Sequence, residues 1–289
     1  MVKQCYQIGS VSITIESDHS LDCSGLFRHF SVAETASADL LFQVRYVDKL
    51  PSCDGASAYE TCLLLNRGDR IQRFYLDMRT HTPFAMTQQS GCCTQILILS
   101  SYLPWGTSVD QLFPLLALNH TLLAKDHLLM HGAFLTYLGN GLLFTGPSGI
   151  GKTTQSRLWQ SRFGATAVNE DRTVLDLSGE PFRICGAPVA GSSPFCSNES
   201  AALKAIIMLA QGPENRIEQL PISKALRYLM GSVYLPASFE SDQTACIDLL
   251  LRLCSTVPVY RLECRPDIAS AELTYQTVFN EDMPCKTPT

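Results

Sequence analysis

Apolar and polar positions alternate with a period of two along much of the first hundred residues, which is typical of half-buried β-strands. Turn-forming stretches at residues 51–55 and 66–69 separate the alternating segments. The pattern predicts strands over residues 10–16, 40–47, 61–65, 70–76 and 94–99, with a short helix near residues 23–30. We therefore expect a mostly antiparallel β region at this end of the chain.

The pattern changes after residue 107, where leucines recur at helical intervals up to residue 124 and Ser108 is a suitable N-cap. An apolar run follows over residues 128–137. Beyond it the sequence predicts strands over 142–145, 165–168, 204–210 and 257–264, and helices over 152–161, 222–230, 242–254 and 267–279. Alternating strands and helices predict an α/β region, so the whole chain is expected to be α+β. We expect domains over 1–106 and 107–280, with a loose tail over 281–289.

Composition narrows the classes of function. Among 289 residues, 46% are hydrophobic and the net charge is −5, so a large core is expected and a general electrostatic grip on nucleic acid is not. The longest uncharged stretch, residues 127–151, is interrupted by glycines and a proline, and the N-terminus lacks an apolar signal segment. We expect a cytoplasmic protein without a membrane span. None of the twelve cysteines has C-x-x-C spacing, which favours buried free thiols over a metal site or disulfides.

One motif carries specific chemistry. Residues 146–153 read G-P-S-G-I-G-K-T and match G-x-x-x-x-G-K-[ST], with a predicted strand before and a predicted helix after. Glycines allow backbone N–H groups to surround phosphate, the lysine reaches the β- and γ-phosphates, and the hydroxyl can ligate Mg²⁺. We therefore expect ATP to bind at Gly146, Pro147, Ser148, Gly149, Ile150, Gly151, Lys152, Thr153 and Thr154.

Two acids follow the next predicted strand. Glu170 and Asp171 lie at its carboxyl end, and Asp171 comes eighteen residues after Thr153. Ligands of open α/β sheets collect at this end of the strands, and Mg²⁺ prefers carboxylate oxygens. A surface turn would also explain the cluster, but its spacing from the loop favours a metal or catalytic role.

Together these residues resemble the HPr kinase family, which is related to ATP-dependent phosphoenolpyruvate carboxykinase. His131-Gly132 begins fifteen residues before Gly146, as in that family, and Glu170-Asp171 stands where the family has two aspartates. The resemblance covers residues 127–175. The range from Gly186-Ala187-Pro188 through residues 213–217 is also similar to small HPr kinase-like proteins, some of which accompany peptide-modifying enzymes. The first hundred residues match nothing in the phosphotransfer-protein kinase, so its substrate is not inherited.

The resemblance implies a P-loop HPr kinase/carboxykinase-like α/β core within residues 107–280 and a kinase mechanism. Asp171 would take the proton from an acceptor hydroxyl, Glu170 would help to hold Mg²⁺ with Thr153, and His131 would lie beside the phosphates. The acceptor would be a serine or threonine of a peptide or protein, or a small hydroxyl metabolite. Related kinases are often hexamers, so a homo-oligomer is an open expectation.

Other residues and functions stay open at this stage. The transferred phosphoryl group calls for a further cation, for which the candidates are Arg172, Arg216 and Arg261. Asn198 and Glu199 could contact the acceptor or metal, and Ser192-Ser193 follow Gly191 where relatives often carry a lysine. A nucleotide-gated module that binds a peptide or partner, a plain ATPase and a reverse phosphorylase are the alternatives. A carboxykinase is less favoured, and no motif decides between ATP and GTP.

Overall fold

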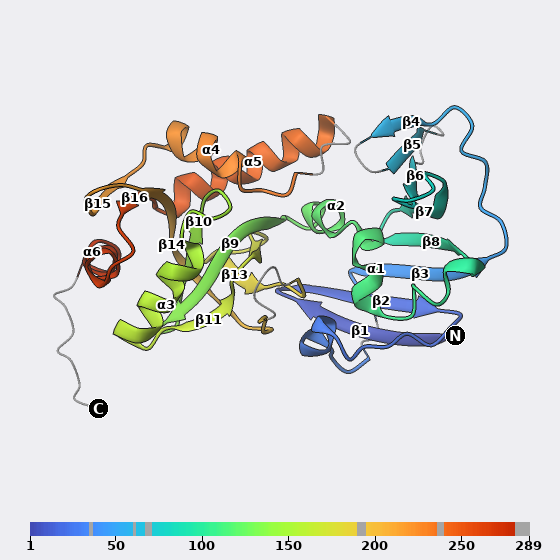
Figure 1. Ribbon diagram of the computed structural model, residues 1–289, viewed down its shortest axis with the longest axis horizontal. Coiled ribbons are helices and arrows are strands. Elements are labelled where there is room, and N and C mark those ends of the chain that lie inside the picture. Colours follow the sequence, from blue (N-terminus) through green and yellow to red (C-terminus); the bar gives the residue numbers. More distant parts are fainter. Residues whose placement is uncertain (35–36, 60–61, 67–70, 190–194, 236–239, 281–289) are drawn as a thin grey trace. The chain divides into compact units, whose positions relative to one another are not determined.

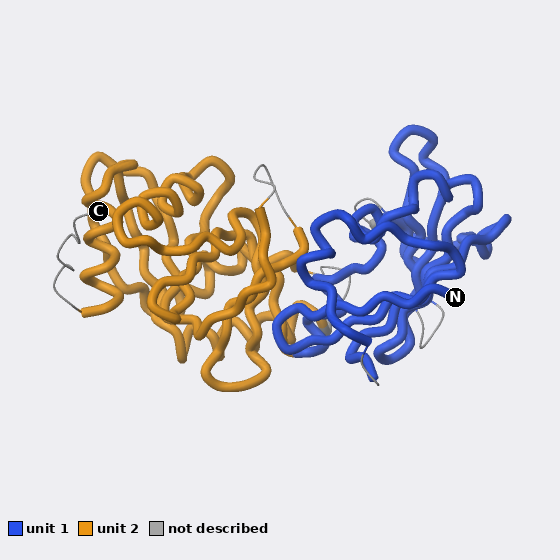
Figure 2. Tube along the Cα trace, turned by 90° about the horizontal axis from the view of Figure 1, so that it is seen from below, with its two compact units in different colours: residues 1–125 blue, residues 126–289 orange. Residues whose placement is uncertain are grey.

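The computed structural model describes residues 1–34, 37–59, 62–66, 71–189, 195–235 and 240–280. The chain divides into two compact units, Met1–Lys125 and Asp126–Thr289 (Figure 2). The division lies after residue 125, so the helical segment before it belongs to unit 1. The sequence had predicted that this segment belongs to the second domain, beginning at residue 107. The expected tail, 281–289, lies outside the described residues.

Unit 1 contains one eight-stranded sheet (Figure 1). Its order is β1-β2-β3-β8-β7-β6-β5-β4, with parallel pairing of β2 to β3 and of β3 to β8 and antiparallel pairing elsewhere. The bounds are β1 Val2–Ile8, β2 Val11–Ser17, β3 Leu40–Val47, β4 Ser57–Tyr59, β5 Cys62–Asn66, β6 Ile71–Leu76, β7 Pro83–Ser90 and β8 Cys93–Leu99. A β-rich, mostly antiparallel region is thus confirmed, with β1, β4 and β7 added.

The helical part of unit 1 differs from its prediction. The short helix is the 3₁₀ turn η1 (Leu26–Phe30), and another, η2 (Ser100–Tyr102), follows β8. The single helix expected up to residue 124 is two, α1 (Val109–Leu116) and α2 (Leu118–Leu123), because Ala117 adopts a left-handed conformation with φ 46°. Pro114 inside α1 also lacks the N–H for a helical bond. Ser108 caps α1, accepting a hydrogen bond from the Gln111 amide.

Unit 2 is built on a second eight-stranded sheet of mixed direction. Its order is β10-β9-β12-β13-β14-β16-β15, with β11 beside β9, and β10 also pairs in parallel with β14. The pairings of β9, β12, β13, β14 and β10 therefore form a closed circuit. The strands are β9 His127–Tyr137, β10 Asn140–Thr145, β11 Thr166–Asn169, β12 Arg172–Asp176, β13 Arg183–Gly186, β14 Ser200–Gln211, β15 Arg216–Gln219 and β16 Val259–Cys264.

Among the described residues, unit 2 also contains the helices α3 Lys152–Phe163, α4 Ile222–Met230, α5 Glu240–Thr256 and α6 Ile268–Phe279. All four were predicted, within a few residues at their ends, and Asp267 caps α6 as expected. Strands β12, β13 and β15 were not predicted. The fold as a whole is mixed, with both helices and sheets, as expected for an α+β chain. No helix among the described residues is long and apolar enough to cross a lipid bilayer.

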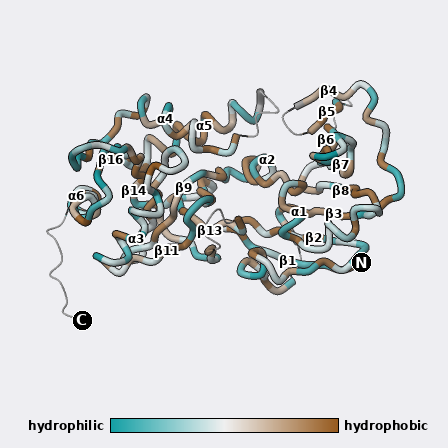
Figure 3. The backbone as a smooth tube through the Cα atoms, viewed as in Figure 1, coloured by the Kyte–Doolittle hydropathy of each residue, from teal (hydrophilic) through white to brown (hydrophobic). Residues whose placement is uncertain are grey.

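Trp159 of α3 lies at the centre of the core that holds α3 and α6 against the sheet. Its side chain is fully buried and contacts Tyr137, Phe144, Phe163 and Tyr275, with ring centres 4.8–6.4 Å apart. In Figure 3 apolar stretches of unit 2 follow its central strands, and residues of these strands form this core together with α3 and α6. Since α3 begins at Lys152, this packing also fixes the helix that follows the glycine-rich loop.

Replacing Trp159 should therefore destabilise unit 2 by different amounts according to what is removed. Trp159→Ala leaves a large cavity and should lower the free energy of unfolding by about 3–5 kcal/mol. Trp159→Phe should lower the free energy of unfolding by clearly less. An aromatic ring remains, and the indole N–H that is removed has no hydrogen-bond partner in the described structure. Chemical denaturation followed by circular dichroism measures both. Equal losses for the two variants would contradict this account of the core.

Candidate functional site

The glycine-rich segment forms a tight loop between β10 and α3. Gly146, Gly149 and Gly151 have φ of 143°, 75° and 116°, a region that side-chain-bearing residues rarely adopt. A Cβ at Gly146 would also lie 3.3 Å from the Leu209 carbonyl oxygen. The loop leads directly into the N-terminus of the twelve-residue helix α3. Successive backbone amides and a helix N-terminus together favour an anion at this place.

Lys152, the first residue of α3, lies over the loop. Only 8% of the residue is exposed, and its Nζ donates hydrogen bonds of 3.1 Å to the carbonyl oxygens of Gly146 and Pro147. Burial lowers the pKa of Lys152, while the nearby Asp171 carboxylate acts in the opposite direction. The ammonium group therefore lies where a bound phosphate could replace two neutral carbonyl partners.

A pocket of about 280 Å³ brings most of the predicted residues together. Its walls come from β9, from the loop and start of α3, and from the turn between β11 and β12. The lining residues are His131, Ser148, Gly149, Gly151, Lys152, Thr153, Thr154, Glu170 and Asp171. Gly146, Pro147 and Ile150, also expected at the phosphate site, are not in this wall, although the first two hold Lys152.

His131 and Asp171 meet because β9 pairs with β12. Arg172 lies opposite His131 in the antiparallel register, and the Gly132 amide donates to the Asp171 carbonyl oxygen at 2.9 Å. The two side chains come within 3.5 Å, from Nδ1 to Oδ1. Burial, and then the charge of Lys152, lower the pKa of His131, which favours the neutral imidazole.

Arg172 and Tyr234 complete the surroundings of Asp171. Arg172 Nε lies 3.6 Å from Asp171 Oδ2 and donates to Tyr234 Oη at 2.9 Å, and its guanidinium lies 4.7 Å from the centre of the Tyr234 ring. Tyr234 Oη is also 3.4 Å from His131 Nδ1. Tyr234 was not predicted from the sequence, because a tyrosine after α4 belongs to no motif and its partner Arg172 is 62 residues away.

The other candidates lie elsewhere. Arg216 and Arg261, on β15 and β16, pair with Glu218 and Glu263 respectively, and neither lines the pocket. Asn198 and Glu199 also lie outside its wall. Gly191, Ser192 and Ser193 fall outside the described residues. Of the three candidate cations, Arg172 is the one placed beside the acids.

Asn169 fixes the turn that carries the acids. It is fully buried, its Nδ2 donates to the carbonyl oxygens of Ala187 and Val189, and its Oδ1 accepts from the Ala187 amide, at distances of 3.1–3.2 Å. Because Glu170 follows directly, these bonds hold the turn against the segment after β13. A buried amide with all three bonds made is a strong local constraint.

The donor atoms of the pocket suit Mg²⁺. The described residues include no group of three or more His, Cys, Asp or Glu that could hold a metal by themselves. The Thr153 hydroxyl and the Glu170 and Asp171 carboxylates nevertheless line one pocket beside the loop. Mg²⁺ is usually bound by one or two carboxylates, with water and substrate phosphates as its other ligands. The residues present therefore fit such an ion.

The lowered pKa of His131 predicts a specific dependence of stability on pH. Between the folded and unfolded pKa values, the unfolded chain holds a proton that the folded chain lacks, so acidification below about pH 6.5 should destabilise the folded state. His131→Gln should remove this contribution. Denaturant unfolding of both proteins from pH 8 to pH 5 measures it. A difference between them that does not change with pH would contradict the prediction.

Comparisons with known proteins bear mainly on the family. No curated protein matches the chain significantly. Among solved structures, an Hpr(Ser) kinase/phosphatase from Coxiella burnetii is 16% identical, covering 53% of this chain and 88% of its own, with a TM-score of 0.31. A TM-score at this level carries no argument about activity.

A family profile gives the clearer result. The profile described as SynChlorMet cassette protein ScmC matches residues 111–268, which is more than half of the chain. The matched range contains the loop, His131, both acids and Tyr234, and it identifies ScmC rather than HPr kinase. The chain therefore belongs to the SynChlorMet cassette protein ScmC family.

Proposed function

We propose that this protein is a Mg²⁺-dependent kinase that transfers the γ-phosphate of ATP to a hydroxyl group. The observation that carries the proposal is one pocket in which the Asp171 carboxylate lies beside the loop lysine, Lys152. The acceptor would be a serine or threonine of a peptide or protein, or a small hydroxyl metabolite. The sequence resemblance to the HPr kinase family supports the same reaction.

Binding of the triphosphate would rest on the loop. Its amides and the N-terminus of α3 would surround the phosphate oxygens, and Lys152 would exchange the carbonyl oxygens of Gly146 and Pro147 for the β- and γ-phosphates. Thr153 and Glu170 would hold Mg²⁺, which supplies charge neutralisation on the phosphates when bound. The chain itself would contribute position and charge, which account for most catalysis of phosphoryl transfer.

Asp171 would act as the general base. Its carboxylate would accept the proton of the acceptor hydroxyl as that oxygen bonds to the γ-phosphorus, and the bond from the γ-phosphorus to the bridging oxygen would break to release ADP. Arg172 and His131 lie within 3.6 Å of the two carboxylate oxygens and would keep them oriented. A neutral His131 can point its Nδ1–H at Asp171 Oδ1 without adding a further positive charge to the site.

Tyr234 is a positioning residue in this scheme. Its hydroxyl accepts from Arg172 and reaches His131 Nδ1, so it links the two side chains that flank Asp171. The guanidinium above its ring restricts Arg172 further. Arg172 would therefore lie ready to stabilise charge that develops on the transferred phosphoryl group.

Transfer of labelled γ-phosphate from Mg·ATP to acceptors in an extract of the source organism tests the proposal. Wild-type protein should label a species whose mass identifies the acceptor, and Lys152→Ala should lose labelling because the phosphates lose their cation. Asp171→Asn should lower the rate by about 10²–10⁴-fold, the usual contribution of a positioned base, while ATP affinity stays within a few-fold. Asp248→Asn, at an exposed position on α5, is the matched control and should behave as wild type.

Two results would reject the kinase. Equal behaviour of wild type, Lys152→Ala and Asp171→Asn in an extract, with ATP still bound, would instead support a nucleotide-gated module for a peptide or partner. Release of inorganic phosphate by wild-type protein without any labelled acceptor would indicate a plain ATPase. Calorimetric titration with Mg·ATP supplies the affinities needed to separate these outcomes.

A further inference from the structure

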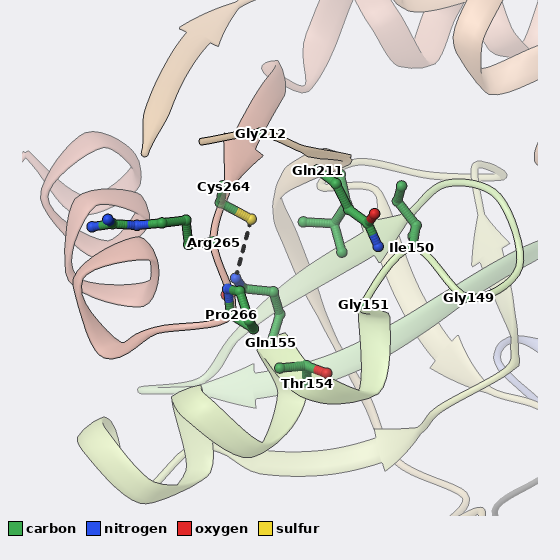
Figure 4. Close-up of a pocket in the computed structure, with 11 residues that line it drawn as sticks. Gly149, Ile150, Gly151, Thr154, Gln155, Gln211, Gly212, Cys264, Arg265 and Pro266 are labelled. Carbon is green, nitrogen blue, oxygen red and sulfur yellow. Dashed lines mark hydrogen bonds between the residues drawn. The ribbon is translucent and has the colours of Figure 1, made fainter. Parts of the chain in front are cut away.

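A second and larger cavity lies on the other side of the glycine-rich loop. Its volume is about 470 Å³, and Figure 4 shows it between the loop, the end of β14 and the end of β16. It shares Gly149, Gly151 and Thr154 with the pocket that contains Asp171. The two cavities therefore flank the same stretch of loop and the same first turn of α3.

The order of residues along the loop indicates which end of a bound triphosphate would face the cavity. In loops of this kind the lysine reaches the β- and γ-phosphates, whereas the backbone amides cradle the α- and β-phosphates. Lys152 shares its pocket with Asp171 and Glu170, which places the γ end of a triphosphate there. The α end must then leave the loop on the side away from the acids, where the second cavity lies against Thr154.

The lining of the second cavity differs from that of the first. Ile150, Leu209 and Pro266 supply apolar surface, and no acidic residue lies in its wall. In Figure 4 the side chain of Gln155 lies next to Cys264, whereas that of Gln211 lies nearer to Ile150 of the loop. Mostly apolar walls, a few polar groups and a volume of several hundred cubic ångströms are typical of a small-molecule site.

Gln155 is a buried polar residue in the wall of the cavity. It is 2% exposed, and its Nε2 donates to Ser270 Oγ at 2.7 Å and to Cys264 Sγ at 3.5 Å. Ser270 Oγ itself donates to the Asp267 carbonyl oxygen, so it must accept from Gln155, which fixes the orientation of the amide. Gln155 Oε1 has no hydrogen-bond partner among the described residues. A buried acceptor without a partner is costly, but this oxygen has almost no accessible surface, so a ligand group would reach it only after the Gln155 side chain turns.

We propose that this second cavity binds the nucleoside, ribose and base, of the nucleotide whose phosphates the loop holds. The assignment rests on the proposed function for the loop itself. Ile150 and Leu209 offer apolar contact to a base, and Thr154 and Gln211 offer polar groups to its edge or to the ribose. The cavity, and not the loop alone, would then make the protein select a nucleotide over a simple polyphosphate.

Calorimetric titration with Mg·ATP and with magnesium tripolyphosphate separates the two contributions. Wild-type protein should bind ATP about tenfold or more tightly than tripolyphosphate, a difference of about 1.4 kcal/mol or more. Gln211→Trp, which fills the cavity from the exposed end of β14, should remove this preference and leave tripolyphosphate binding unchanged. Gln219→Trp, at an exposed position of β15 outside the cavity, is the matched control and should keep the preference.

A second measurement uses the unmodified sequence. Cys264 lines the cavity and Cys254 of α5 does not, and burial raises the pKa of both thiols. Mg·ATP should slow alkylation of Cys264 by N-ethylmaleimide at mildly alkaline pH, as measured by peptide mass spectrometry. Tripolyphosphate should not slow it, and neither ligand should alter the alkylation of Cys254.

The outcomes distinguish the cavity from the loop. Equal affinity for ATP and tripolyphosphate, without protection of Cys264, would overturn the nucleoside assignment and leave the proposed kinase standing. Failure of both ligands to bind would overturn the proposed function and this inference together. Protection by ATP that persists in Gln211→Trp would also overturn the assignment, because the filled cavity could not then be the site.

Discussion

The pairing of β9 with its neighbours is the constraint on which the candidate site depends. One strand holds β10, which leads into the loop, and β12, which follows the acids. His131 lies where these two pairings meet, and its carbonyl oxygen accepts from Thr145 at the end of β10. Gly132 follows it because a Cβ there would overlap the Leu143 side chain and lie 3.0 Å from the Phe144 carbonyl oxygen. A glycine at position 132 is thus a packing requirement, while the chemical role of His131 stays a prediction.

Burial opposes positive charge in the site. The pKa values of Lys152 and His131 are both lowered, mainly because the two side chains are buried, while the Asp171 carboxylate acts in the opposite direction on each. The carboxylates of Glu170 and Asp171 lie in the same pocket as Lys152. A phosphate bound at the loop would favour the charged form of Lys152 further, because an opposite charge nearby stabilises it.

The sequence predicted those features that are encoded locally. The spacing of Gly146, Gly151 and Lys152 indicated the loop, and apolar periodicity indicated the four helices of unit 2. The strand β7 was not predicted, because its buried residues run consecutively and do not alternate. The break between α1 and α2 at Ala117 was not predicted either, because periodicity does not reveal a single left-handed residue. Whether the loop residues bind ATP and Mg²⁺ stays a prediction.

Features that depend on distant contacts could not be read in this way. Tyr234 reaches Arg172 and His131 only through the three-dimensional fold, and the cavity beside Gln155 joins the loop to β16, more than a hundred residues away. No known spacing of residues along a sequence predicts either the contacts of Tyr234 or this cavity. Short strands such as β12 and β13 likewise gain their stability from neighbours more than from their own composition.

The closed circuit of strands in unit 2 has a consequence for how this part of the chain acquires its structure. The pairing that closes the circuit joins β10 to β14, and it connects residues such as Phe144 and Ile207. Bringing such distant segments together carries an entropic cost that precedes any gain from contact, and topologies of this kind fold slowly. The glycine-rich loop begins directly after β10, so its position depends on this long-range pairing. A chain in which β10 and β14 have not yet paired would therefore lack the support that β14 gives to the loop.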